Sequence, residues 1–228
     1  MEELPSEGLS GSPLLTIVAL GALTLLPFVF MTTTSFVKIS VVFSILRNAL
    51  GTGQVPSGTI ITALAAILSL YVMAPVGSAI MDAAAPAVER IDRGDPMATS
   101  DAVFDAIELG AEPLRDFLVH NAHARELALF LDLARDARPD ADRASITERD
   151  LLVAMPAFVI SELTEAFQIG FLVFLPFLVV DMVVANVLLA LGMHMLSPTQ
   201  VSMPFKLLLF VLVDGWFLLA RALVLGYA

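Results

Sequence analysis

Two aspartates, Asp181 and Asp214, lie inside apolar runs where a carboxylate could carry chemistry. Two carboxylates held close together share a proton, which is the basis of aspartyl proteolysis. The Gly-x-Gly-Asp context of intramembrane aspartyl proteases is missing, since Val179 and Val180 precede Asp181. A proton relay through Glu162 and the two aspartates is the other possibility, although one chain has too few helices for an inverted-repeat transporter.

A second group of candidates could bind a metal. Asp116, His120, His123 and Glu126 could share one helical face with metal-ligand spacing. Metal sites need convergent ligands, usually from more than one element, so a solvated helix face is the better prediction. The glycine-rich stretch 51–58, GTGQVPSG, lacks the Lys-Ser/Thr of a phosphate loop and is expected to be a turn. We therefore expect no catalytic residue, no metal and no other cofactor.

The third candidate is the stretch 191–198, LGMHMLSP, in which Met193 and Met195 flank His194. It separates two apolar runs and is expected to form the tip of a helical hairpin. Methionine fills irregular gaps because its side chain is flexible, and histidine titrates near pH 6.5. From the residues alone, core packing at the hairpin tip is the preferred interpretation, and the direction of the histidine ring stays open.

The composition is that of a membrane protein. Hydrophobic residues make up 58% of the chain and charged residues only 15%, far from the usage of soluble domains. The net charge of -11 comes mostly from one region, because 16 of the 23 acidic and eight of the 12 basic residues lie in 82–150. No basic stripe indicates a nucleic-acid partner, and the absence of cysteine excludes disulfides.

These candidates must be positioned by four apolar blocks, which are 14–46, 59–87, 151–196 and 203–226. A single helix over 157–196 would be about 60 Å long, twice the roughly 30 Å core of a bilayer. Both long blocks contain Leu-Pro-Phe near the middle, at Pro27 and Pro176. We predict an all-α, membrane-associated fold of helical hairpins with long kinked helices.

The predicted domains follow from these blocks. They are an N-terminal tail (1–13), an N-terminal helical hairpin (14–87), an extracytoplasmic helical insert (88–150) and a C-terminal helical hairpin (151–228). Lys38 and Arg47 flank the loop after the first block, so the positive-inside rule places that loop in the cytoplasm and the insert outside. The apolar spacing within the insert has a helical period, and Thr147-x-x-Asp150 is a capping signal for the third block.

Polar residues within the third and fourth blocks predict an oligomer. Glu162, Glu165 and Gln168 recur at every third position, which places them on one helical stripe. A charge at a bilayer centre costs about 2.5 to 3.5 kcal/mol, so burial against protein is expected; for Glu162 and Glu165 the water interface is the alternative. The residues expected to be buried by protein are Gln168, Asp181, Asn186 and Asp214. Glu162 is predicted to pair with Lys206 of its own or a neighbouring copy.

Two segments carry a family resemblance. Residues 34–56, TSFVKISVVFSILRNALGTGQVP, and residues 155–223, with the phrases FQIGFL, LPFLVVDMVVA and PFKLLLFVLVDGW, resemble the SctR/FliP family of type III secretion export-apparatus proteins. The match leaves out the extreme N-terminus and the insert. The flagellar branch of the family commonly carries a cleavable signal peptide, whereas the first residues here lack the positive region of one. The resemblance therefore favours the injectisome branch.

The resemblance implies a non-enzymatic subunit of an inner-membrane export gate for unfolded proteins. It implies a helical pore complex of several SctR copies, expected as a pentamer, with SctS-like, SctT-like and SctU-like partners. It makes 192–196 a gate loop in which Met193, His194 and Met195 contribute to a seal, and it matches Glu162 and Lys206 to the family's charged pair. The insert is then periplasmic. The alternative is a subunit of another oligomeric membrane channel or a proton-coupled transporter.

Overall fold

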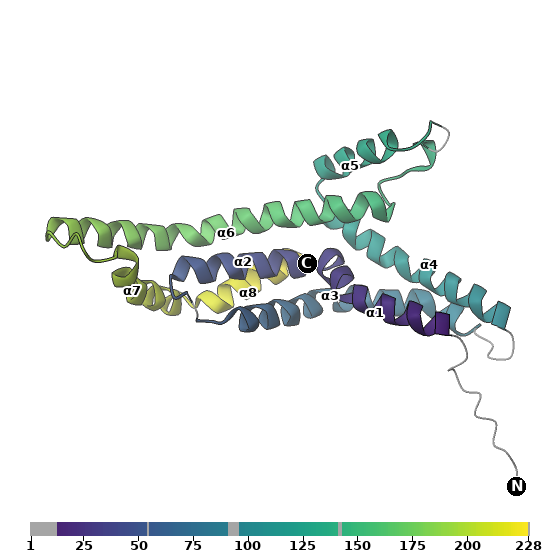
Figure 1. The fold of residues 1–228 in the computed structure, drawn as a ribbon, viewed down its shortest axis with the longest axis horizontal. Helices are drawn as coiled ribbons and strands as arrows, with labels where there is room; N and C mark the ends of the chain where they lie inside the picture. The colour runs from purple at the N-terminus through teal and green to yellow at the C-terminus, as the bar shows by residue number, and fades with distance from the viewer. Residues whose placement is uncertain (1–12, 54, 91–95, 141–142, 228) are drawn as a thin grey trace, which may run out of the picture.

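The computed structural model describes residues 13–53, 55–90, 96–140 and 143–227, so the predicted tail lies almost entirely outside the described residues. The described part contains helices and no strands, which confirms the all-α prediction. The α-helices are α1 (Pro13–Thr33), α2 (Phe36–Leu50), α3 (Gly58–Val88), α4 (Pro96–Asn121), α5 (Ala124–Asp136), α6 (Leu151–Ala190), α7 (Pro198–Leu212) and α8 (Gly215–Leu225). Figure 1 shows α6 running along most of the molecule beside α2, with the hairpin tip at one end and α4 and α5 at the other.

The first apolar block bends by 72° between α1 and α2. The bend lies at Thr34 and Ser35, and Pro27 stays inside α1. The Thr34 hydroxyl donates to the Phe30 carbonyl (2.6 Å) and accepts from the Phe36 amide (3.3 Å), so the side chain satisfies backbone groups that the break would leave open. The kink predicted near the proline therefore falls at the hydroxyl cluster beyond it.

Helix α3 returns from the loop after α2. Gly51 ends α2 in the left-handed conformation with φ 73°, which glycine adopts without steric cost. Ser57 caps α3 by accepting from the Ile60 amide. A glycine end and a serine start are the sequence signals expected of a helical turn, and they set the two helices side by side.

The insert forms two helices, as predicted. Helix α4 packs against α3 and α6, and α5 packs against α6. Arg149, just before α6, joins the insert to the third block through ion pairs of 2.7 Å with both Glu112 and Asp116. The N-cap of α6 is Asp150, whose carboxylate accepts from the Thr147 amide (3.1 Å). The capping signal thus marks the start of the helix, with the aspartate as the cap.

Helix α6 is unbroken over 40 residues although it contains Pro156 and Pro176. The fourth block was expected to be one helix, but α7 and α8 meet at an angle of 61°. At this joint Gly215 lies so close to the Phe210 ring that an added Cβ would be 2.1 Å from it. The aspartate-glycine pair at 214–215 is a turn signal that the prediction of one continuous helix overlooked.

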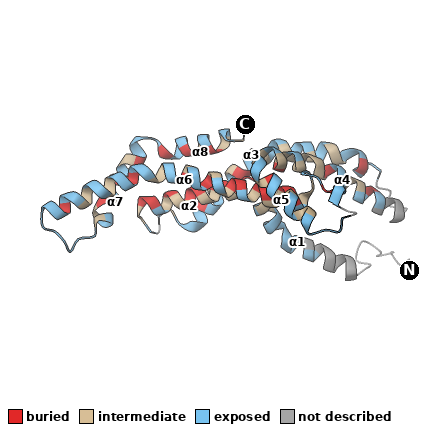
Figure 2. Ribbon diagram, turned by 90° about the horizontal axis from the view of Figure 1, so that it is seen from above, coloured by how far each residue is buried: buried red, intermediate tan, exposed pale blue. Residues whose placement is uncertain are grey.

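The main apolar core surrounds α2, where Ile39, Val42, Phe43 and Leu46 are fully buried. Outside this core the helices expose much of their apolar surface, as the exposed residues along α6, α7 and α8 in Figure 2 show. Helices α3 and α6 are long and apolar enough to cross a membrane, and the two bent pairs raise the number of candidate spans to four. The single chain leaves most of this surface uncovered.

Candidate functional site

The methionine loop lies at the exposed tip between α6 and α7. Gly192 adopts φ 72°, and the Met193 and Gly192 amides donate to the Leu188 (2.9 Å) and Leu189 (3.0 Å) carbonyls. This is the Schellman arrangement, which satisfies the last carbonyls of a helix and turns the chain. Met195 is 97% exposed and Met193 47%, so neither is a core filler within one chain.

His194 is also exposed at this tip. Its backbone amide donates to the Gly192 carbonyl (3.1 Å), while its residue surface stays open to the surroundings. The residue is therefore not buried within the hairpin of one chain. Three neighbouring side chains, two of them methionines, are thus presented together at the end of the longest helix.

A buried charge cluster ties the third block to α2. The Lys38 ammonium lies 2.9 Å from a Glu162 oxygen and 2.7 Å from a Glu165 oxygen. The Lys38 and Glu162 side chains are 3% and 0% exposed, while Glu165 is 33% exposed. A water-interface position is thus excluded for Glu162 within the chain. The Lys38 ammonium serves both carboxylates, and Glu162 depends on it more than Glu165 does because Glu162 is fully buried.

The C-terminal end of the chain closes this cluster. The Tyr227 hydroxyl donates to Glu162, and the Lys38 ammonium lies 4.1 Å from the centre of the tyrosine ring. The same ring stacks on Phe117 of α4, with ring centres 6.1 Å apart. A tyrosine can serve both neighbours because its ring is apolar and attracts cations while its hydroxyl bonds to a polar partner.

The same cluster reaches the insert through His123, just before α5. Its Nε2 lies 2.9 Å from Glu165 and its Nδ1 3.6 Å from Glu126. Its backbone amide donates to the Ser161 hydroxyl (2.8 Å). Residues from α2, the insert, α6 and the C-terminus therefore meet at one point.

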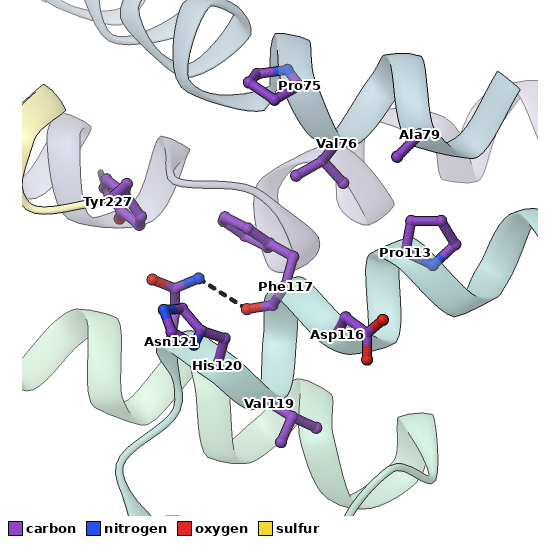
Figure 3. A pocket seen from close by; sticks show the side chains of 10 residues that line it. All are labelled: Pro75, Val76, Ala79, Pro113, Asp116, Phe117, Val119, His120, Asn121 and Tyr227. Carbon is purple, nitrogen blue, oxygen red and sulfur yellow. Dashed lines mark hydrogen bonds between the residues drawn. The ribbon is translucent and has the colours of Figure 1, made fainter. Parts of the chain in front are cut away.

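Figure 3 shows an apolar cleft beside this point, between α3 and α4. Pro75 and Val76 form one wall, Phe117 the other, and Tyr227 closes one end. Asn121 lies at the cleft but donates to the Phe117 carbonyl of its own helix (2.8 Å). The cleft therefore presents mainly apolar surface, and Asp116 and His120 of α4 also line it.

A second charge cluster holds the α6–α7 hairpin to the end of α2. The Lys206 ammonium lies 2.6 Å from Asp181 and donates to the Ala49 carbonyl (2.9 Å). The Ser202 hydroxyl donates to the other Asp181 oxygen. Ala49 lies in the last turn of α2, where the open carbonyls of a helix stabilise a cation. Within the single chain, Asp181 thus has a cation and a hydroxyl as partners.

The predicted pairing of Glu162 with Lys206 is not formed within one chain. Glu162 pairs with Lys38 in the first turn of α2, whereas Lys206 pairs with Asp181 at the last turn. Lys38 and Ala49 are about 17 Å apart along the axis of α2, so the lysines serve separate clusters. Pairing between neighbouring copies, the other form of the prediction, stays a prediction.

The polar residues that the sequence predicts to be buried by protein are exposed or half-buried in the single chain. Gln168, Asn186 and Asp214 are exposed in the single chain, and Asp181 is half-buried. The first three therefore find no burial within the chain, because α6 and α8 turn those faces outward. Their burial by further subunits is not tested by one chain and stays a prediction.

In the described part of the chain, the residues of three candidate sites do not come together: a metal site, an aspartyl pair and a proton relay. Asp116 binds Arg149 and His123 binds Glu165, and the described residues contain no group of acids, histidines or cysteines that could hold a metal. Asp181 binds Lys206, while Asp214 is exposed at the joint before α8. An aspartyl pair and a continuous proton relay are thus both unsupported in the described part of the chain.

Sequence reasoning missed three residues of these clusters. Lys38 was used only for orientation, although a lysine in an apolar run needs a partner. His123 was considered only as a metal ligand, and Tyr227 was not considered. The signal for Lys38 was present in its apolar context, whereas nothing in the sequence indicates which acid the C-terminal tyrosine meets.

Comparison with known proteins identifies the family. Residues 19–223 match the FliP family. The Yop proteins translocation protein R of Yersinia pestis is 46% identical over 212 residues, covering 92% of this chain and 94% of that protein. Virulence protein YscR of Salmonella typhimurium is 42% identical over 223 residues, covering 96% and 99%. The flagellar biosynthetic protein FliP of Pectobacterium carotovorum is 42% identical over 228 residues, covering 99% and 83%. These matches confirm the resemblance seen in the sequence motifs, and the chain belongs to the FliP family.

Proposed function

We propose that the chain is a core subunit of the export gate of a type III secretion system. At the coarser level, family membership and relatives named as secretion and translocation proteins support a subunit of the export apparatus. At the finer level, the subunit forms the entry pore for unfolded secreted proteins. Its partners in this proposal are other copies of itself, expected as a pentamer, with SctS-like and SctT-like subunits and an SctU-like switch protein.

The observation that carries the proposal is the surface of α6. Its 40 residues extend about 60 Å, twice the roughly 30 Å of hydrocarbon in a bilayer. Only 11% of its most apolar window is buried within the chain, and the exposed face carries Gln168 and Asn186. Lipid cannot cover the whole length, and it disfavours the polar side chains. Other subunits are the cover that fits both features.

The exposed tip of α6 supplies the gate in this proposal. A ring of Met193 and Met195 from several copies would close a pore by excluding water, and flexible thioethers can repack around a moving chain. His194 lies between them, so a neutral ring fits the seal and a protonated ring would hydrate it.

The proposed location is the inner membrane. Apolar helices and the family support a membrane-associated subunit. The loop between α2 and α3 follows Lys38 and Arg47, and the positive-inside rule favours the cytoplasm for it. The insert, 88–150, is then on the periplasmic side.

Purification in detergent tests the assembly. We expect co-expression with SctS-like and SctT-like subunits to give one stable multi-subunit complex that contains several copies of this chain. A monomer or simple dimer that never retains the partners would contradict the proposal and favour a different channel or transporter. Cells from which this subunit is deleted should also lose secretion.

The seal has its own test. Changing Met193 and Met195 together to glycine should raise ion leakage through the idle complex, because the ring loses its apolar side chains. The matched control changes Met182, an exposed methionine on α6 away from the tip, to glycine. Leakage no greater than in the control would leave the methionines without a sealing role.

A further inference from the structure

The charged residues of the apolar segments are not all paired within one chain. Segments 13–81 and 151–227 contain four acidic and four basic residues: Glu162, Glu165, Asp181, Asp214, Lys38, Arg47, Lys206 and Arg221. Two lysines neutralise three of the acids in the clusters described above. In the described part of the chain, Asp214, Arg47 and Arg221 form no ion pair. Each remaining charge lies in apolar sequence, where an uncompensated charge is costly.

Asp214 is held in an unusual conformation. It is the one non-glycine residue with positive φ in the described segments (φ 53°, ψ 50°), a conformation that is uncommon for residues with a Cβ. The contact of Gly215 with Phe210 fixes the joint. The Asp214 carboxylate caps no amide of α8 and is exposed between Val213 and Phe217, which are themselves 48% and 57% exposed. Such retained strain is typical of functional positions.

Arg221 is the better matched of the two free cations. It follows Asp214 by seven residues, about two helical turns, so both lie on one side of α8. It is exposed and borders an apolar groove between α3 and α8 that Leu68 and Tyr71 line. Arg47 differs, because it is half-buried in the last turn of α2, where helix carbonyls already stabilise a cation.

We propose that the exposed side of α8, residues 214–221, is an interface between two copies of this chain in which Asp214 of one copy pairs with Arg221 of the next. Figure 2 shows α8 along one face of the molecule with most of its residues exposed. A second copy supplies the complement of both charges, and the apolar residues between them exclude water from the pair. Lipid would supply neither complement.

The contact also explains why both charges remain free. When successive copies are displaced along α8, each copy offers its acid to one neighbour and its base to the other, so the contact is heterologous and repeats from copy to copy. Such a contact builds a ring or a helical array in which only terminal copies keep an unpaired charge. This inference rests on the proposed self-assembly and names one contact within it.

Self-association of the purified chain in detergent tests the pair. Asp214→Asn keeps a residue that tolerates left-handed φ, and Arg221→Gln keeps the polar stem. Since truncating one partner of a buried interfacial pair costs several kcal/mol, each change should raise the concentration for half-association about tenfold or more. The double variant should be no weaker than either single variant, because the pair is already lost. Glu148→Gln, an exposed acid of the insert, is the matched control.

The outcomes separate this contact from the proposed function. If the wild-type chain assembles and both variants associate like the control, this inference is overturned while the gate proposal stands. A double variant weakened by the product of the single effects would also overturn the pairing. If Arg221→Gln changes only binding to anionic lipid vesicles, the arginine faces lipid headgroups and the interface is wrong. If the wild-type chain never self-associates, both proposals fall. Helical content by circular dichroism verifies that each variant is folded.

Discussion

Replacing Lys38 by methionine should destabilise the fold more than any other single removal of a charge. Methionine keeps most of the apolar stem but removes the ammonium shared by Glu162 and Glu165. Glu162 is fully buried, so its carboxylate would stay uncompensated apart from the Tyr227 hydroxyl. Breaking a buried pair in this way costs about 3–5 kcal/mol. Glu165 adds less, because it is one-third exposed and still contacts His123.

The assay is denaturant unfolding of the purified protein in detergent, followed by circular dichroism. The control is Arg90→Met, which breaks the Arg90–Asp105 pair whose side chains are 58% and 49% exposed; an exposed pair contributes about 0–1 kcal/mol. Adding Glu162→Gln to Lys38→Met should recover part of the loss, since the stranded charge is then removed. A free energy of unfolding for Lys38→Met equal to that of the control would refute the reasoning.

Two further predictions concern neighbouring contacts. Tyr227→Phe should lower the free energy of unfolding by about 1.5–3 kcal/mol, because Glu162 loses a buried hydrogen bond; Tyr71→Phe, at an exposed tyrosine, should leave it unchanged. Hydrogen bonds from Arg149, then Arg115, lower the pKa of Glu112 below 4.5. Its contribution to stability is therefore present above about pH 4.5 and is lost as the pH falls through the lowered pKa. The protection factors of the α4 amides, which correct for the pH dependence of intrinsic exchange, should fall in that acidic range, and Glu112→Gln should abolish the fall; protection factors that stay constant with pH in both proteins would contradict the prediction.

The elements could be predicted because their signals are local. The apolar lengths gave the helices, and Gly51, Ser57, Asp150 and Gly192 are residues that end or start helices for reasons of φ or hydrogen bonding. The bend between α7 and α8 was missed although its signal is equally local. The prediction gave more weight to the apolar residues around Asp214-Gly215 than to the turn signal of this pair. The close approach of Phe210 to Gly215 is a tertiary contact, which a local pattern does not show.

The pairing of charges could not be predicted, because it depends on how far one helix is displaced along another. The sequence shows that Glu162 and Lys206 need partners, but Lys38 satisfies Glu162 and Asp181 satisfies Lys206 equally well. A shift of α6 by about three turns along α2 would bring Glu162 to the end of α2, where Lys206 lies, without changing any local pattern. The family motif supplied one pairing, and the fold of the single chain uses others.

The position of the two charge clusters sets which part of α6 can move. Glu162 is fixed near the start of the helix by Lys38 of α2, and Asp181 is fixed beyond its middle by Lys206 of α7, which also donates to the Ala49 carbonyl of α2. Beyond Asp181 the helix continues to the Schellman turn at Gly192, with only Leu188 buried along the way. Because buried ion pairs resist rearrangement while exposed apolar segments have few contacts to break, opening of the proposed gate should involve residues 182–197 and leave the clusters intact.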